Sequence, residues 1–355
     1  VKVYQRLNGS WTQIGQTLYG DDPNDSFGES VDITADGQTI IVGAPQNWGD
    51  SCWSLEDCRS RSDENRPGYI KVFEYNGTNW VQLGSKLMGE NSGDSFGWRA
   101  VISADGSVIA GSSFRNWGDT TDDYSTATSD TSWQTGHVMV WKLNVDTWDR
   151  FGSDIHHPEK HPGMWFGNSL DMSGDGSKIV VGARQHDGEI TDQGSVTIFS
   201  WCDEGNGYGW NCSNTVWGDN ENDIFGTDVR MNLDGSIFAG SSIRNDGSNG
   251  TKENSGQVKV YRVFYQQQGS IVGTSILGDP LYGEDELDYS GNVHGISLSN
   301  RGDIIGISAP YNDDGANNAG QVKIFQFNEN QWTQIGEDIE GTKSNQRIGT
   351  VAISR

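Results

Sequence analysis

The sequence has little proline and few basic residues for its length. Only 7 of its 355 residues are proline whereas 48 are glycine, a balance typical of many tight turns between short strands. The 24 lysines and arginines face 49 aspartates and glutamates, and the formal net charge is −25. A field of this sign repels phosphate backbones and anionic membrane surfaces, so nucleic acid is a poor partner, whereas cations are attracted.

Long apolar runs are also missing. None approaches the length of about 18 residues that a membrane-spanning helix needs, so we expect no membrane span. The first residues already resemble a strand, so we expect any leader to have been removed or left out. The composition still indicates a folded protein, because 10% of the residues are aromatic and 14 are tryptophan.

Cysteine is rare, and the four cysteines form two close pairs, Cys52 with Cys58 and Cys202 with Cys212. Neither pair has the Cys-x-x-Cys spacing of a zinc site, so we predict two disulfides that staple loops, with free thiols as the alternative. Sequons for N-glycosylation occur at Asn8, Asn24, Asn76, Asn211 and Asn249. Together these features indicate a secreted or cell-surface glycoprotein.

One pattern recurs along the chain. It reads DSFGESVDITADGQTIIVGAP from Asp25, and related segments start near residues 94, 164, 223 and 288, with a sixth start near 346. Glycines at positions 28, 97, 167, 226, 291 and 349 lead these segments, so the spacing is 58 to 70 residues. A period of this size indicates a repeated supersecondary unit.

Each repeat reads as four antiparallel strands. An alternating strand with Val31 and Ile33 leads to an Asp-Gly pair, which we interpret as a two-residue hairpin turn, and a short buried strand follows. A third strand begins at a glycine, and a fourth carries tryptophan in the form W-x-x-x-G, at Trp11, Trp80, Trp148 or Trp332. Such sheets must stack on neighbours, and radial closure avoids exposed ends. We therefore predict an all-β fold, a β-propeller of four-stranded antiparallel blades.

The repeats predict one propeller domain over residues 1–355. Six blades fit the pattern, and seven are the alternative if whole repeats are missing. Residues 1–20 supply the third and fourth strands of the closing blade, and the segment from 346 supplies its first strand. The last blade is thus expected to be a composite of N- and C-terminal strands, and its second strand is absent from the sequence.

The Phe-Gly and Gly-Ala-Pro elements of the repeat, Phe27-Gly28 with Gly43-Ala44-Pro45, resemble FG-GAP repeats. Such repeats form the propeller of integrin alpha chains and occur in secreted microbial and algal proteins. The resemblance covers nearly the whole chain, and it implies the fold more strongly than a function. Integrin-type repeats often carry an Asp-x-Asp-x-Asp-Gly calcium loop between the first two strands. Here that connection is the short turn Ala35-Asp36-Gly37, so this metal loop is not carried over.

Acidic side chains recur in a different loop, between the fourth strand of one repeat and the first strand of the next. Clustered carboxylates suit calcium, which takes six to eight oxygen ligands, so weak calcium sites are one prediction. The alternative is that these residues are solvated and cap backbone amides in turns. The residues are Asp21, Asp22, Asp25, Glu90, Asp94, Asp219, Asp223, Glu284, Asp285 and Asp288.

Loops between the second and third strands carry tryptophan beside amides and carboxylates, and two of them contain Asn-Trp-Gly-Asp. A flat apolar ring beside hydrogen-bonding groups is the chemistry of sugar binding, and binding sites often lie on loops of a rigid scaffold. The alternative is that these tryptophans pack over neighbouring blades. The candidate ligand-binding residues are Asn47, Trp48, Asp50, Asn116, Trp117 and Asp119.

A histidine-rich segment, His-His-Pro-Glu-Lys-His, stands where other repeats have an acidic loop. Its three imidazoles, His156, His157 and His161, have donor atoms that zinc or copper would accept. We favour the interpretation that they are solvent-exposed loop histidines.

The sequence contains none of three common catalytic motifs: Gly-x-Ser-x-Gly, His-Glu-x-x-His and a phosphate-binding glycine loop before a helix. We therefore predict a non-enzymatic extracellular module that contacts protein or matrix partners in a surface assembly, with calcium as its one expected cofactor. The first alternative is a lectin-like carbohydrate binder that uses the Trp/Asp loops. A polysaccharide hydrolase is the third alternative. Its catalytic pair of carboxylates would be recognised only by their spacing in the fold, which the sequence does not show.

Overall fold

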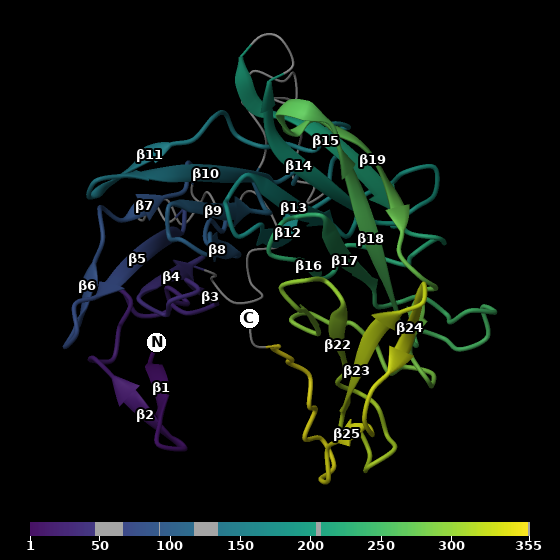
Figure 1. The fold of residues 1–355 in the computed structure, drawn as a ribbon. Helices are drawn as coiled ribbons and strands as arrows, with labels where there is room; N and C mark the ends of the chain where they lie inside the picture. The colour runs from purple at the N-terminus through teal and green to yellow at the C-terminus, as the bar shows by residue number, and fades with distance from the viewer. Residues whose placement is uncertain (47–66, 92, 117–133, 204–206, 354–355) are drawn as a thin grey trace. The chain divides into compact units, whose positions relative to one another are not determined.

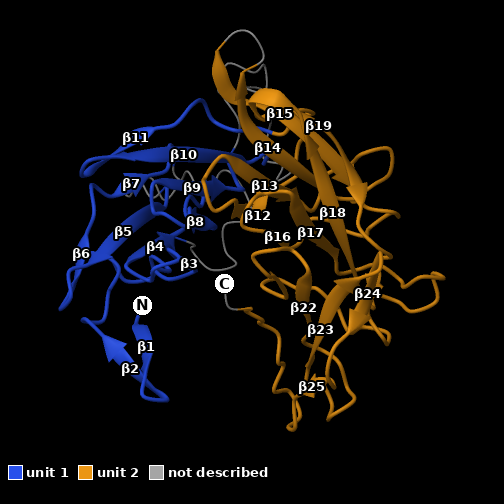
Figure 2. Cartoon of the chain, in the orientation of Figure 1, with its two compact units in different colours: residues 1–156 blue, residues 157–355 orange. Residues whose placement is uncertain are grey.

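The computed structural model describes residues 1–46, 67–91, 93–116, 134–203 and 207–353 (Figure 1). These residues form β-strands, with a short 3₁₀ turn at Gln267–Gly269. In this part of the chain no helix has the length and apolar character to cross a membrane. The chain divides into two compact units, residues 1–156 and 157–355, which we call the N-terminal and C-terminal units (Figure 2).

The N-terminal unit contains a hairpin and two sheets whose strands pair in sequence order. The short strand β7 adds to β5. The hairpin is β1 (Val3–Leu7) and β2 (Ser10–Ile14); the first sheet is β3 (Ser30–Ile33), β4 (Thr39–Ala44), β5 (Tyr69–Tyr75) and β6 (Trp80–Gln82), with β7 (Leu87–Met88); the second is β8 (Ala100–Ile102), β9 (Val108–Ser113), β10 (His137–Asn144) and β11 (Thr147–Arg150).

The C-terminal unit contains three sheets of the same kind, in which β20 adds to β18 and β25 adds to β23. The sheets are β12 (Phe166–Met172), β13 (Lys178–Ala183), β14 (Ser195–Asp203) and β15 (Tyr208–Trp217); β16 (Val229–Met231), β17 (Ile237–Ser242), β18 (Gln257–Tyr265) and β19 (Ile271–Ile276), with β20 (Leu281–Tyr282); and β21 (Ile296–Leu298), β22 (Ile304–Ala309), β23 (Gln321–Asn328) and β24 (Gln331–Gln334), with β25 (Ile339–Glu340). The predicted all-β class and the four-stranded antiparallel sheets are confirmed.

The Asp-Gly turns are longer than predicted. In the first sheet Thr34 N–H donates to the Thr39 carbonyl at 3.0 Å, so residues 35–38 form the turn, and the two-residue hairpin prediction is wrong. Asp36 accepts hydrogen bonds from Thr34 Oγ1 (2.6 Å) and Gln38 N–H (2.9 Å). Because this carboxylate holds the turn together, only Gly37 needs a positive φ, of 69°.

Neighbouring sheets within a unit are joined by a recurring backbone contact. A parallel bridge links the glycine before four of the third strands to the residue before the leading glycine of the next repeat, at Gly68–Phe96, Gly194–Phe225, Gly256–Ser290 and Gly320–Ile348. The last bridge shows that the sixth repeat starts as the others do. Its described residues, 346–353, form no strand, so the first strand predicted there is not found.

The recurring tryptophan packs on the sheet that precedes its own. Indole Nε1 of Trp80 donates to the Ile14 carbonyl at 3.1 Å, and Trp148 and Trp332 donate in the same way to Leu83 (3.1 Å) and Leu277 (2.7 Å). The residue that follows each accepting carbonyl in the chain is a glycine with positive φ: Gly15, Gly84 and Gly278. A Cβ atom on any of the three would lie within 2.5 to 2.8 Å of the ring. The glycine after the fourth strand, which at Gly15 and Gly84 is the glycine of the W-x-x-x-G pattern, thus makes room for the tryptophan of the following sheet.

Apolar clusters fill the space between successive sheets. One joins the two sheets of the N-terminal unit and includes Ile41, Phe96 and Trp148. Two more lie between the sheets of the C-terminal unit, around Phe225 and around Ile305. Since strand residues are buried on both faces, each sheet depends on its neighbours for stability.

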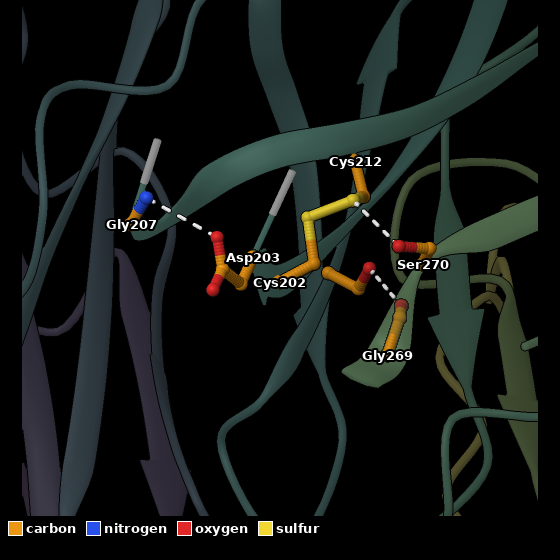
Figure 3. Close-up of a disulfide and its surroundings, with 7 residues drawn as sticks. Cys202, Asp203, Gly207, Cys212, Gly269 and Ser270 are labelled. Carbon is orange, nitrogen blue, oxygen red and sulfur yellow. Dashed lines mark hydrogen bonds between the residues drawn. A yellow bond between two sulfur atoms is a disulfide. The ribbon is translucent and has the colours of Figure 1, made fainter. Parts of the chain in front are cut away.

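A disulfide joins Cys202 of β14 to Cys212 of β15 (Figure 3). The predicted pairing is confirmed, but the bond links two paired strands rather than a loop. Nearby, Ser200 Oγ donates to the Gly269 carbonyl at 2.6 Å, which ties this hairpin to the next one. Cys52 and Cys58 lie outside the described residues.

Replacing both Cys202 and Cys212 with serine is expected to lower the free energy of unfolding by about 2–4 kcal/mol, because the open chain regains loop entropy. Both residues are buried, so the lost sulfur packing adds to this effect. Denaturant unfolding of the oxidised wild type and the double variant measures it. Equal midpoints and slopes would contradict the expectation.

Candidate functional site

Within each unit, described residues of the loops before first strands meet described residues of the loops after second strands, at an end of the sheets that we call the loop end. An aspartate before a first strand accepts a hydrogen bond from an asparagine after a second strand, at Asp94–Asn116 (3.0 Å), Asp223–Asn245 (3.0 Å) and Asp288–Asn312 (3.2 Å). All six residues are buried. These pairs fix the shape of the loop end.

These three aspartates, and Asp25 at the equivalent position of the first repeat, also accept hydrogen bonds from backbone amides. Asp94 Oδ2 accepts from Asn91 N–H at 2.9 Å, and Asp223 Oδ2 accepts from Asp219 and Asn220 N–H at 3.1 and 3.0 Å. Asp25 accepts from the N–H groups of Asp21, Asp22 and Phe27, and Asp288 from that of Asp285. These are the contacts of the turn-capping alternative.

The acidic residue four positions earlier pairs with a lysine in three sheets. Asp21 pairs with Lys71, Asp219 with Lys259 at 2.6 Å, and Glu284 with Lys323. Each lysine is the third residue of the third strand, β5, β18 or β23. Hydrogen bonds from Lys71 and Lys323 lower the pKa of Asp21 and Glu284 respectively. A calcium ion at these loops would compete with the ammonium groups, so the calcium sites stay a prediction.

The remaining predicted calcium ligands differ in their surroundings. Asp22 and Asp285 are exposed. Glu90 is also exposed, and its sheet has Met139 in place of the lysine. Glu90 instead lies with His137 and Asp154 in a group whose ligand atoms are within 4.8 Å of one another.

Burial raises the pKa of Asp94 to about 6, because desolvation outweighs its hydrogen bonds from Asn116 and Asn91. The folded state therefore takes up this proton more readily than the unfolded state, whose aspartates titrate near 3.9. The stability contribution of Asp94 is greatest below pH 4 and is lost as the pH rises through about 6, by roughly 3 kcal/mol.

Asp94→Asn is expected to remove this pH dependence, because the amide oxygen still accepts hydrogen bonds and carries no charge. The variant should match the wild type at pH 4 and be the more stable protein at pH 8. Denaturant unfolding of both proteins between pH 4 and 8 tests this. Parallel stability curves would show that Asp94 titrates normally.

The predicted sugar-binding residues fall mostly outside the described part of the chain, namely Asn47, Trp48, Asp50, Trp117 and Asp119. Asn116 is described, is 2% exposed and donates its amide to Asp94. Its side chain is thus engaged inside the protein. The sugar-binding role of the other five stays a prediction.

All five sequon asparagines, Asn8, Asn24, Asn76, Asn211 and Asn249, are exposed. Asn76 lies in the turn between β5 and β6, where its Oδ1 accepts from Thr78 and Asn79 N–H. Glycans on these residues would be accommodated on the surface. Glycosylation itself stays a prediction.

The histidine segment is less exposed than predicted. His161 is exposed, but His157 is 3% exposed, and its ring centre lies 4.2 Å from that of His186. The interpretation of these residues as exposed loop histidines is therefore wrong for His157. His186 could not be linked to them from the sequence, because it follows β13, on the far side of the intervening hairpin.

A cavity of about 380 Å³ opens at the loop end within the C-terminal unit. Loops of its three sheets line it, with Arg184, Gln185, Ile224, Ile243, Arg244, Tyr289, Asn292 and Tyr311. The Tyr289 and Tyr311 rings are in edge contact, with centres 5.3 Å apart. The Arg184 guanidinium stacks 4.7 Å from the centre of the Trp165 ring. Sequence reasoning missed this site, because its residues come from five separate loops.

Two guanidinium groups on a chain of net charge −25 make this cavity chemically distinct. Arginine offers a planar set of donors that matches carboxylate, sulfate or phosphate oxygens. The tyrosines add apolar faces with hydroxyl groups. The cavity therefore suits a ligand that has an anionic group beside an apolar surface.

Comparison with known proteins gives one family match. Residues 153–199 match the FG-GAP repeat. This span contains Phe166-Gly167 and Gly182-Ala183, the third repeat of the sequence pattern. The match confirms the resemblance on which the sequence interpretation was based, and an FG-GAP repeat suggests a protein-interaction module.

Comparison with curated proteins finds no match. Among solved structures, the chain is similar to a putative 6-phosphogluconolactonase from Bacteroides uniformis ATCC 8492. The identity is 11%, the TM-score is 0.49, and the alignment covers 94% of this chain and 89% of that chain.

Proposed function

We propose that this protein with an FG-GAP repeat is a non-enzymatic extracellular interaction module that contacts a protein or matrix partner in a surface assembly. The repeat match and the exposed sequons support this proposal. The observation that carries it is the arginine- and tyrosine-lined cavity at the loop end of the C-terminal unit.

The scaffold of this module is a six-bladed propeller in which β1, β2 and the segment from residue 346 share the closing blade. The Gly320–Ile348 bridge supports this, because it repeats the contact between successive sheets. Ser308 Oγ donates to the Gly349 carbonyl at 2.9 Å, as Ser30 does to Gly97 and Ser169 to Gly226. Both contacts support the proposal that the C-terminal segment starts another blade.

The partner presents an acidic side chain to the cavity. Arg244 is exposed and Arg184 half-buried, so the cavity is open to a group on another protein. A carboxylate between the two guanidinium groups would gain charge-assisted hydrogen bonds, while Tyr289 and Tyr311 contact the apolar part of the ligand. The strongly negative remainder of the surface disfavours ligands of high negative charge.

Binding of two immobilised probes tests the proposal: an acidic, tyrosine-containing peptide, and polygalacturonate, a carboxylated polysaccharide. We expect peptide binding that weakens at least about tenfold in Arg244→Ala, the equivalent of about 1.4 kcal/mol. Arg262→Ala, which removes an exposed arginine outside the cavity, is the matched control. Binding of polygalacturonate alone would support the lectin-like alternative, and binding of neither probe would contradict both roles.

A further inference from the structure

The third repeat departs from the others at the loop end. His186 occupies the position of Asn116, Asn245 and Asn312, because all four residues accept the N–H of the glycine before the third strand through their backbone carbonyls. Met164 stands in the sequence position of the aspartates that pair with these asparagines. The third residue of β14 is Thr197, where three other sheets have lysine. The third repeat has thus lost both the Asp–Asn pair and the acid–lysine pair.

Histidine and glutamate side chains replace these pairs. Glu159, His161 and His186 each offer one ligand atom, and these atoms all lie within 4.8 Å of one another. Glu159 and His161 come from the loop before β12, and His186 from the loop after β13. The His161 and His186 ring centres are 5.1 Å apart, and Trp217 covers His186 at 4.7 Å.

His186 is the anchor of this group. Its side chain is fully buried, Nδ1 lies 3.0 Å from Ser195 Oγ, and Nε2 has no hydrogen-bond partner among the described residues. A buried nitrogen without a partner is unfavourable by about 1–3 kcal/mol unless another group satisfies it.

We propose that Glu159, His161 and His186 form a binding site for a divalent transition metal, with Zn²⁺ as the ion that best fits two imidazoles and a carboxylate. Zinc accepts this donor set in tetrahedral geometry, and water would complete the coordination. Ser195 would orient His186 through Nδ1, as hydrogen-bonding partners of metal-bound histidines generally do. The ion would clip the loop before β12 to the loop after β13, in the place where other repeats use Asp–Asn pairs.

A second group, Glu90, His137 and Asp154, is less suited to a cation. It contains a single imidazole, and Asp154 forms an ion pair with Arg150. The guanidinium group repels a metal ion and already occupies the carboxylate. We therefore place the metal at His186.

Titration of chelator-treated, dialysed full-length protein with ZnCl₂, followed by calorimetry, tests the proposal. One zinc ion should bind per chain, and the melting temperature should rise with free zinc as binding linkage requires. His161→Ala and Glu159→Gln each change an exposed residue and should weaken zinc binding at least about tenfold, because loss of even an outer-shell partner has effects of that size. His294→Ala, which removes a histidine outside both groups, should bind zinc as the wild type does.

Three results would overturn the site: no saturable zinc binding, equal affinity in wild type and His161→Ala, or loss of binding in Glu90→Gln with retention in His161→Ala. The last result would place the ion at His137. Melting of each metal-free variant beside the wild type shows whether a lost affinity reflects a lost ligand or a lost fold.

Discussion

Trp80→Ala is expected to lower the free energy of unfolding by about 3–5 kcal/mol, as the removal of a buried tryptophan usually does. Trp80 is 2% exposed, and its ring packs against Tyr75 with centres 5.0 Å apart. Its indole Nε1 donates to the Ile14 carbonyl, and Gln16 hydrogen-bonds both its backbone N–H and its carbonyl. The variant would therefore leave a cavity and an unpaired carbonyl at the contact between the β1–β2 hairpin and the first sheet.

Chemical denaturation of the wild type and Trp80→Ala measures the effect. Tyr19→Ala, at a side chain that is 78% exposed, is the control for loss of an aromatic residue without loss of packing. The control should change stability by less than about 0.5 kcal/mol. A similarly small effect at Trp80 would contradict the role given to the W-x-x-x-G pattern.

Trp11→Ala is expected to cost about 2–4 kcal/mol, although Trp11 is 70% exposed in the structure. The reason is that the first fourth strand of the series carries a tryptophan and the last one is followed by a glycine, the two partners of the contact seen between successive sheets. Gly336 follows β24 with φ +75°, as Gly15, Gly84 and Gly278 follow other fourth strands, and among the described residues no atom lies within 4 Å of its Cβ position. If the propeller closes as proposed, we expect Trp11 to pack on Gly336 and its indole N–H to donate to the Ile335 carbonyl.

A double-mutant cycle separates closure from local effects at Trp11. Trp11→Ala and Gly336→Ala should show a coupling energy of about 0.5–3 kcal/mol, because the two residues touch only in the closed ring. Additive effects, with Trp11→Ala inside the range of ordinary surface substitutions, would show that the closing blade does not form.

Much of the architecture could be predicted because one short pattern is repeated. A strand that alternates as Val31 and Ile33 do, an Asp-Gly turn and a buried run define the same hairpin each time, so each repeat supports the others. The turn differs from the prediction, because the side chain of Asp36 stabilises a longer loop than the Asp-Gly dipeptide alone indicates. The sequence also shows tryptophan and glycine together, but only the fold shows that Gly15 and Gly84 receive the tryptophan of the next sheet.

The candidate site was harder to predict, because its residues meet through the stacking of loops from different strands. Lys259 and Asp219 are 40 residues apart, and Asn245 and Asp223 are 22 apart. The sequence groups the carboxylates in these loops but does not show their lysine and asparagine partners, and the calcium sites stay a prediction. The segment from His156 to His161 stands out in the sequence, but His186, the third residue of the proposed zinc site, lies beyond a complete hairpin.

The distance between the two ends of the repeat series tests the account most directly. Spin labels at Thr12→Cys and Val81→Cys mark equivalent points beside Trp11 and Trp80, within the N-terminal unit, and provide a reference distance for two successive blades. Labels at Thr12→Cys and Thr333→Cys mark the same points across the proposed closure. Pulsed electron resonance on the oxidised protein should give a single narrow distance for the second pair, similar to that of the first. A longer or broad distribution for the second pair would contradict the closed propeller.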